Sequence, residues 1–219
     1  MTATREEMLS RLVDTRLYLV TEDAIPAERR LQSVTAALAG GAKVVQLRDK
    51  RTARRRLLQE ARALRRLCHE WGAVFIVNDD IALAWCSDAD GVHLGQDDLP
   101  VEDARRLLGP SKLVGLSISA LQEAVEAERL GVDYIGVGAI YATPTKLDAE
   151  LGGLELLRDV RAAVSKPLVA IGGIDESNAA EAFAAGADSV AVVRAVFAQP
   201  DVAAAARNLL EIAQTTKGR

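Results

Sequence analysis

The sequence predicts an α/β fold, a single-domain (β/α)₈ barrel of the TIM-barrel type, from three observations. Short runs rich in β-branched residues alternate with amphipathic segments along the 219-residue chain. Their connections are short, and no Pro- or Ser-rich linker divides them. Polar clusters follow the apolar runs, where catalytic loops leave the strands of such a barrel. We therefore favour a barrel over an open doubly wound sheet, with one domain over 1–219 that includes an N-terminal helical extension, 1–15.

The expected elements alternate regularly. We place strands at 17–21, 44–48, 74–78, 91–94, 113–117, 134–137, 168–171 and 189–193. These runs consist mainly of apolar residues, which is typical of parallel strands buried on both faces. The segments between them have helical periodicity. In segment 54–71, one buried stripe is expected to consist of Leu57, Ala61, Leu64, Cys68 and Trp71.

Composition limits the classes of partner. The formal net charge of −4 gives no bulk attraction to nucleic acid or to an anionic membrane. The arginine-rich segment 51–66 lacks the aromatic residues of a nucleic-acid surface, and we interpret it as a solvated helix face. Cys68 and Cys86 have no metal-ligand spacing and are expected to be reduced packing residues. We predict a cytoplasmic enzyme without membrane or nucleic-acid partners; the sequence leaves a homo-oligomer open.

The second expected strand ends in an amide and two cations. The period-2 rule places Gln46 and Arg48 on one face, and Lys50 continues that row beyond the strand. An arginine fork and a lysine point charge at a barrel mouth suit a phosphate or a diphosphate. A solvent-exposed strand end is the alternative, although the interior of a barrel has no solvated strand face.

Carboxylate pairs follow the third and fourth expected strands. Asp79 and Asp80 come after an apolar run, and Asp97 and Asp98 follow the next one. Asp80 is placed to cap the following helix, which leaves Asp79 as the better metal ligand. Hard oxygen ligands on neighbouring strand ends match Mg²⁺, which takes one or two carboxylates with water and substrate phosphates.

Three later loops are candidates for phosphate binding. The loop after the sixth strand contains Thr143, Pro144, Thr145 and Lys146, with hydroxyls and one cation. The seventh strand leads into Gly172 and Gly173, and the eighth into Val193 and Arg194. Loops seven and eight are the usual phosphate site of this barrel; a tight turn without a phosphate role is the less favoured alternative for the two glycines.

No covalent nucleophile is indicated. His93 lies within a strand, where a lone histidine is more often a hydrogen-bonded packing residue than a base. No Ser/His/Asp or Cys/His arrangement and no zinc motif is visible. Hydrolysis through a covalent intermediate is therefore not expected.

Together, seven motifs in matching order resemble the thiamine phosphate synthase (thiamine-phosphate pyrophosphorylase) family. They are LYLVT at Leu17, QLRDK at Gln46, VND at Val77, VHLGQDD at Val92, GLSIS at Gly115, GAIYATPTK at Gly138 and AIGGI at Ala170. The resemblance spans nearly the whole chain. It implies a Mg²⁺-dependent transferase of thiamine biosynthesis, which joins hydroxymethylpyrimidine diphosphate to a thiazole phosphate and releases pyrophosphate.

The resemblance also implies roles for residues. The pyrimidine diphosphate would be held by Gln46, Leu47, Arg48, Asp49, Lys50, Asn78, Ser117 and Lys146. Mg²⁺ would be held by Asp79 and Asp98. The thiazole phosphate would be received by Thr143, Pro144, Thr145, Gly173, Val193 and Arg194. Arg48, Lys50 and Lys146 would stabilise the charge that develops on the leaving diphosphate.

One position departs from the family, and two other functions compete. Arg194 stands where relatives commonly have a small hydroxyl residue. An isomerase related to the thiazole tautomerase would use the phosphate loops but not the paired carboxylates. A non-catalytic barrel would bind phosphorylated ligands without releasing pyrophosphate. Lys50, Asp79, Asp98 and Lys146 favour the synthase.

Overall fold

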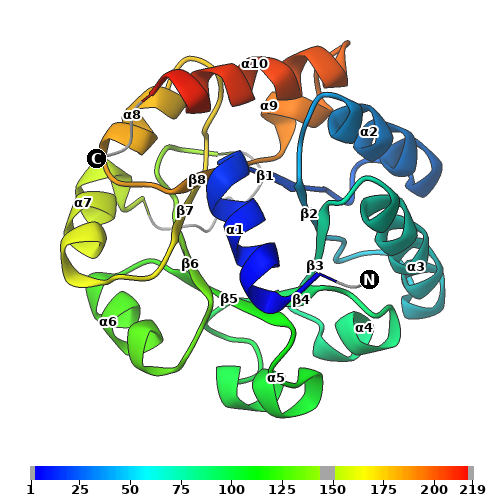
Figure 1. The fold of residues 1–219 in the computed structure, drawn as a ribbon, viewed down its shortest axis with the longest axis horizontal. Helices are drawn as coiled ribbons and strands as arrows, with labels where there is room; N and C mark the ends of the chain where they lie inside the picture. The colour runs from blue at the N-terminus through cyan, green and yellow to red at the C-terminus, as the bar shows by residue number, and fades with distance from the viewer. Residues whose placement is uncertain (1–2, 144–150, 217–219) are drawn as a thin grey trace.

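The fold is a closed barrel of eight parallel strands in sequential order, which confirms the predicted fold class (Figure 1). The computed structural model describes residues 3–143 and 151–216. Every strand pairs in parallel with its neighbours, and β1 pairs with β8 to close the ring. The strands are β1 (Leu17–Val20), β2 (Val44–Leu47), β3 (Val74–Asn78), β4 (Gly91–Leu94), β5 (Leu113–Ile118), β6 (Tyr134–Val137), β7 (Leu168–Ile171) and β8 (Ser189–Val192).

Helices form a ring around the barrel (Figure 1). They are α2 (Ala27–Ala39), α3 (Arg54–Glu70), α4 (Ile81–Cys86), α5 (Val101–Leu108), α6 (Leu121–Arg129), α7 (Gly153–Ala163), α8 (Ala179–Ala184), α9 (Arg194–Phe197) and α10 (Val202–Thr215). Each turns an apolar stripe toward the strands, as amphipathic helices do. A large core between strands and helices results, which includes Leu38, Leu64 and Leu157.

One further helix, α1 (Arg5–Thr15), lies across the amino-terminal mouth of the barrel, at the centre of Figure 1. A capping box on Thr4 and Glu7 starts it. Its buried Met8 and Leu12 pack on residues of the barrel interior such as Val44. This helix therefore closes the end of the barrel opposite the strand ends that carry the polar clusters.

Three aspartates repeat one arrangement at that amino-terminal end. Asp90, Asp133 and Asp188 directly precede β4, β6 and β8. Each donates its backbone N–H to a carbonyl on the preceding strand, and its carboxylate accepts the N–H of that same residue. Each also pairs with an arginine: Arg65, Arg105 and Arg161, respectively. Because the backbone and the side chain of each aspartate are both hydrogen-bonded, we infer that this end of the barrel contributes to stability.

Strand ends differ slightly from the prediction, for a physical reason at β1 and β2. Thr21 and Arg48 were expected inside strands but lie just beyond them. The Thr21 hydroxyl accepts the Arg48 N–H at 3.0 Å and donates to the Arg48 carbonyl at 3.3 Å. A side chain therefore replaces the backbone ladder at this position. Val193 likewise follows β8, whereas β5 runs one residue further, to Ile118.

Two smaller expectations about packing were wrong. Cys86 is exposed at the end of α4, whereas Cys68 is buried as expected. Trp71 is the C-cap residue of α3 and stays 38% exposed, because the helix ends before the apolar stripe reaches it.

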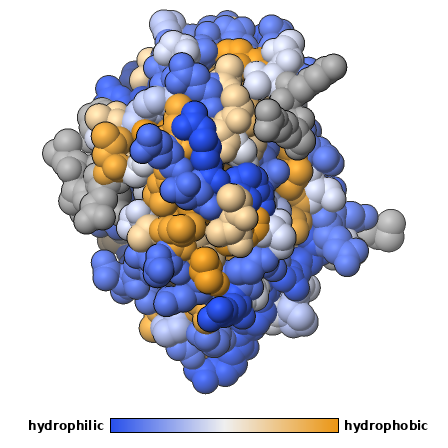
Figure 2. Space-filling view, turned by 90° about the vertical axis from the view of Figure 1, so that its left-hand side faces the viewer, coloured by the Kyte–Doolittle hydropathy of each residue, from blue (hydrophilic) through white to orange (hydrophobic). Residues whose placement is uncertain are grey.

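On the face seen in Figure 2, hydrophobic residues lie in groups among hydrophilic ones. Within residues 3–143 and 151–216, no helix has the length and hydropathy that crossing a bilayer needs.

Candidate active site

A cavity of ≈ 830 Å³ opens at the carboxyl ends of the strands. All eight strands contribute lining residues, from Tyr18 of β1 to Ala191 of β8. Such a cavity has the size of a small-molecule site and the location of active sites in this fold. The residues that the sequence singled out as chemical therefore converge on one place.

Gln46, Arg48 and Lys50 line one side of this cavity, as the period-2 rule predicts. Arg48 has no ion pair with any residue of the described ranges, so its guanidinium is available to an anion. Leu47 and Asp49 alternate with them and are not part of the lining: Leu47 packs in the outer core, and Asp49 pairs with Arg30. The strand and its extension thus present a row of polar groups inward, and the residues between them outward.

A carboxylate pair, Asp79 and Asp98, lies on the same cavity wall as Arg48 and Lys50, the cationic row. Lys50 Nζ is 3.3 Å from Asp79 Oδ2, and Asp98 is near enough to Asp79 to influence its pKa. Burial and the neighbouring Asp98 raise the pKa of Asp79, while Lys50 acts in the opposite direction. Two carboxylates in contact share a proton or are neutralised by a cation, so this pair is prepared for positive charge.

Asp79 and Asp98 fit the donor set of a magnesium ion. A hydrogen bond orients the Asp98 carboxylate: its Oδ2 accepts the Gly95 N–H at 2.7 Å. In the described part of the chain, no group of three or more His, Cys, Asp or Glu residues could hold a metal. A cation here would consequently complete its shell with water and phosphate oxygens, which is the usual habit of Mg²⁺.

The neighbouring Asp80 is a helix cap, as predicted. Its side chain accepts the Leu83 N–H at 2.8 Å and caps α4. It also pairs with Arg54 at 2.7 Å. Asp97 is exposed on the cavity wall, and it does not cap the following helix: α5 begins at Val101, and its N-cap residue Pro100 makes no side-chain cap.

A chain of hydrogen bonds crosses the cavity floor. Gln46 donates to Tyr18 at 2.8 Å, the Tyr18 and Tyr134 hydroxyls are 2.9 Å apart, and Tyr134 is 3.1 Å from His93 Nδ1. His93 Nε2 lies 2.8 Å from Ser117 Oγ. Burial lowers the pKa of His93 to about 4, so the ring is neutral near pH 7. His93 is a hydrogen-bonded interior residue, as expected: it contacts Ser117 directly, and the two tyrosines link it to Gln46.

The interior makes room for these rings through small residues. A Cβ at Gly115 would lie 2.2 Å from Tyr134 Cζ and 2.5 Å from His93 Nδ1. Only glycine therefore permits the two rings to stack there, with centroids 5.4 Å apart. Tyr18 and Tyr134 were absent from the sequence-based site, because an isolated tyrosine in an apolar strand looks like ordinary core.

The opposite side of the cavity carries the glycine turn after β7. Gly172 and Gly173 have φ of 106° and 63°, and both line the cavity. A Cβ on Gly173 would lie 2.6 Å from the Ala142 carbonyl oxygen, so this turn also seats the start of the loop after β6. The two glycines form a turn that lines the cavity, and their role in phosphate binding stays a prediction.

The remaining expected ligands fall into two groups. Asn78, Ser117, Thr143, Val193 and Arg194 all line the cavity, and Arg194 is exposed at the first position of α9. Pro144, Thr145 and Lys146 lie outside the described residues. The sequence analysis missed Gln96, which lines the cavity and donates to the Ser117 carbonyl at 2.7 Å. The only hint for it was its place between the fourth strand and Asp97.

Comparison with known proteins agrees with this geometry. The thiamine monophosphate synthase family matches residues 17–196. Thiamine-phosphate synthase of Chloroflexus aurantiacus is 50% identical over 211 residues, 95% of this chain and 97% of the relative. That of Moorella thermoacetica is 49% identical over 205 residues, covering 93% and 98%. Thiamine phosphate pyrophosphorylase from Pyrococcus furiosus superposes with a TM-score of 0.87 at 39% identity, covering 94% of this chain and 100% of that one. The chain therefore belongs to the thiamine monophosphate synthase family.

Proposed function

We propose that this protein catalyses the condensation of 4-amino-2-methyl-5-hydroxymethylpyrimidine diphosphate with a thiazole phosphate, giving thiamine monophosphate and pyrophosphate. Family membership supports the reaction class. The observation that carries the proposal is the meeting of Arg48 and Lys50 with Asp79 and Asp98 on one cavity wall. Cations beside a carboxylate pair suit a metal-bound diphosphate better than they suit a single phosphate ester.

Leaving-group stabilisation is the first contribution of the chain. The C–O bond between the pyrimidine methylene and the diphosphate breaks, and its electron pair stays on the departing oxygen. Arg48 and Lys50 would stabilise the charge that develops there, as would Lys146. Asp79 and Asp98 would hold Mg²⁺, which would supply further positive charge to the same diphosphate.

Positioning of two substrates is the second contribution. The electron-rich aminopyrimidine supports the positive charge left on its methylene carbon, and the thiazole nitrogen attacks that carbon with its lone pair. Gln46, Asn78 and Ser117 would hold the pyrimidine over the cavity floor. Thr143, Pro144, Thr145, Gly173, Val193 and Arg194 would hold the thiazole phosphate, so that the attacking nitrogen meets the carbon directly. No general base is required, in keeping with a neutral, buried His93.

Mass spectrometry of the products separates this reaction from a single-substrate isomerisation. With both substrates and Mg²⁺, we expect thiamine monophosphate, and with thiazole phosphate alone we expect that compound unchanged. Conversion of the thiazole phosphate to an isomer without added metal would instead support the isomerase, which has no use for the paired carboxylates.

A further inference from the structure

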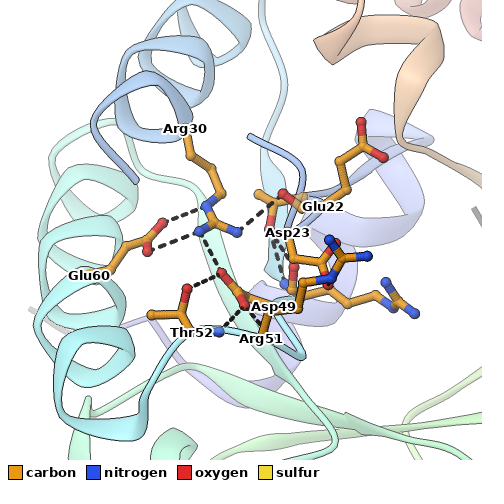
Figure 3. A network of polar contacts seen from close by, with 9 residues as sticks. Glu22, Asp23, Arg30, Asp49, Arg51, Thr52 and Glu60 are labelled. Atoms are coloured by element: carbon orange, nitrogen blue, oxygen red, sulfur yellow. Dashed lines mark hydrogen bonds and ion pairs between the residues drawn. The ribbon is translucent and has the colours of Figure 1, made fainter. Parts of the chain in front are cut away.

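A buried ion cluster includes Asp49, the residue between Arg48 and Lys50 of the cavity wall (Figure 3). Its members are Arg30 of α2, Asp49 of the β2–α3 loop and Glu60 of α3. Arg30 is 1% exposed, although charged side chains are rarely buried so completely. A buried ionic cluster is weak support for stability, so a role in fixing geometry has to be considered.

Arg30 uses its whole guanidinium in this cluster. One edge faces Glu60, with Nε 2.6 Å from Oε1 and Nη2 3.2 Å from Oε2. Nη2 also donates to Asp49 Oδ2 at 2.7 Å, and Nη1 donates to the Glu22 carbonyl at 3.2 Å. The arginine thereby joins the loop after β1, the loop after β2 and helix α3 at one point (Figure 3).

Asp49 closes the β2–α3 loop on itself. Its Oδ1 accepts the backbone N–H groups of Arg51 at 2.9 Å and Thr52 at 2.8 Å, and its Oδ2 accepts the Thr52 hydroxyl at 2.8 Å. Burial acts to raise the pKa of Asp49, but these hydrogen bonds, together with the one from Arg30, outweigh it and hold the pKa well below its usual range. The loop is thus built around an ionised, outward-facing carboxylate.

Asp49 is turned away from the cavity that its two neighbours line. In an extended chain successive side chains point to opposite sides, and Arg48 and Lys50 both line the cavity while Asp49 does not. Thr21 holds the Arg48 backbone on the other side of this point. Neither Arg48 nor Lys50 is anchored by deep burial of its own side chain. Their placement therefore depends on the residue between them.

We propose that Arg30 is a positioning residue for diphosphate binding: by holding Asp49 outward, it keeps Arg48 and Lys50 on the cavity side of the β2–α3 loop. This inference rests on the proposed function for the identity of the anion. In this role Arg30 touches neither substrate, and Asp49 supports the placement of Arg48 and Lys50.

The test compares two buried aspartates at opposite ends of the barrel. Asp49→Asn removes the charge that pairs with Arg30 but keeps a carbonyl oxygen for the loop N–H groups. Asp133→Asn is the matched control, since Asp133 is also buried, accepts the Val114 N–H at 2.7 Å and pairs with Arg105 at 2.9 Å. Binding of inorganic pyrophosphate with Mg²⁺ is measured by calorimetry, and KM for each substrate by initial rates.

If Arg30 and Asp49 position the cations, Asp49→Asn weakens pyrophosphate binding and raises KM for the pyrimidine diphosphate by about tenfold, the worth of one hydrogen bond to a charged group. KM for the thiazole phosphate stays within about twofold. Asp133→Asn, by the same reasoning, lowers the unfolding temperature and leaves both KM values unchanged. The milder Thr52→Val gives a smaller change in the same direction as Asp49→Asn, and it serves if that variant does not fold.

A double-mutant cycle shows whether the effect passes through Lys50. In a Lys50→Met background, Asp49→Asn should weaken pyrophosphate binding by clearly less than it does in wild type. Equal losses in both backgrounds, equal losses in Asp133→Asn, or a wild-type protein that binds no pyrophosphate would each overturn the proposal. A different result would separate the two proposals. If pyrophosphate binding responds as expected but the protein shows no turnover, the proposed function is contradicted and the positioning role stands.

Discussion

Lys50 Nζ lies 3.3 Å from Asp79 Oδ2, which joins a cation after β2 to an acid at the end of β3. Lys50 opposes the burial and the Asp98 charge that raise the pKa of Asp79. It thereby favours the ionised form of Asp79, the proposed metal ligand, while its own side chain remains 58% exposed. One contact thus connects the residues proposed to bind the diphosphate with the pair proposed to bind the metal.

Asp79→Asn is predicted to lower Mg²⁺-dependent turnover by orders of magnitude, because a neutral amide replaces one of two anionic ligands. Asparagine tolerates the left-handed backbone at this residue, where φ is 63°, so folding is expected to persist. Removing a charge that faces Asp98 should leave the unfolding temperature near or above that of wild type. Asp98→Asn is expected to behave in the same way. Steady-state rates and thermal unfolding check both variants; full activity would remove the pair as metal ligands.

Asp80→Ala is the neighbouring control. Asp80 caps α4 and pairs with Arg54 on the outside of the cavity wall. Loss of an N-cap costs about 1 kcal/mol of stability, and an exposed ion pair adds little. Denaturant unfolding should show that loss, while kcat stays within about threefold of wild type. A collapse of turnover in Asp80→Ala would show that the carboxylates had been assigned wrongly.

Gly173→Ala is predicted to raise KM for the thiazole phosphate. At φ of 63° a Cβ is strained, and here it would also lie 2.6 Å from the Ala142 carbonyl oxygen, so the turn has to move. Gly131→Ala is the matched control, because Gly131 has φ of 73° but no atom within 4 Å of the added Cβ. Both variants should lose about 1 kcal/mol from backbone strain, and only Gly173→Ala should change KM. Equal kinetics in the two variants would separate this turn from phosphate binding.

His93 should make the folded state sensitive to acid. Its pKa falls from 6.5 to about 4 on burial, so between these values the unfolded chain binds the extra proton. Above pH 6.5 the imidazole is neutral in both states and does not lower the free energy of unfolding. As the pH falls from 6.5 toward 4, protonation of the unfolded chain lowers that free energy by up to roughly 3 kcal/mol. His93→Gln should flatten the dependence of the unfolding free energy on pH in that window. An unchanged slope in His93→Gln would show that the imidazole titrates normally.

Local patterns in the sequence were enough to predict the barrel and one face of its site. Alternating apolar runs marked eight strands, and period-2 spacing placed Gln46, Arg48 and Lys50 on one wall. The contact between Lys50 and Asp79 joins two strand ends, and only the closed barrel sets their distance. A family resemblance suggested the roles of both residues, but it gave no geometry.

Other parts of the site were beyond sequence reasoning because their partners are far apart in the chain. Arg30 occupies an ordinary amphipathic helix, where an arginine is expected to be solvated, and its burial follows from Asp49 and Glu60 meeting it. Tyr18 and Tyr134 form the floor through a hydrogen bond between residues that are 116 positions apart. Tertiary structure alone creates such pairs.

Pyrophosphate release tests the central claim most directly. Purified protein is mixed with the pyrimidine diphosphate, the thiazole phosphate and Mg²⁺, and each component is then omitted in turn. We predict release only when all three are present, with one thiamine monophosphate formed for each pyrophosphate. Folded protein that releases no pyrophosphate under any of these conditions, or that releases it without the thiazole phosphate or the metal, would contradict the account.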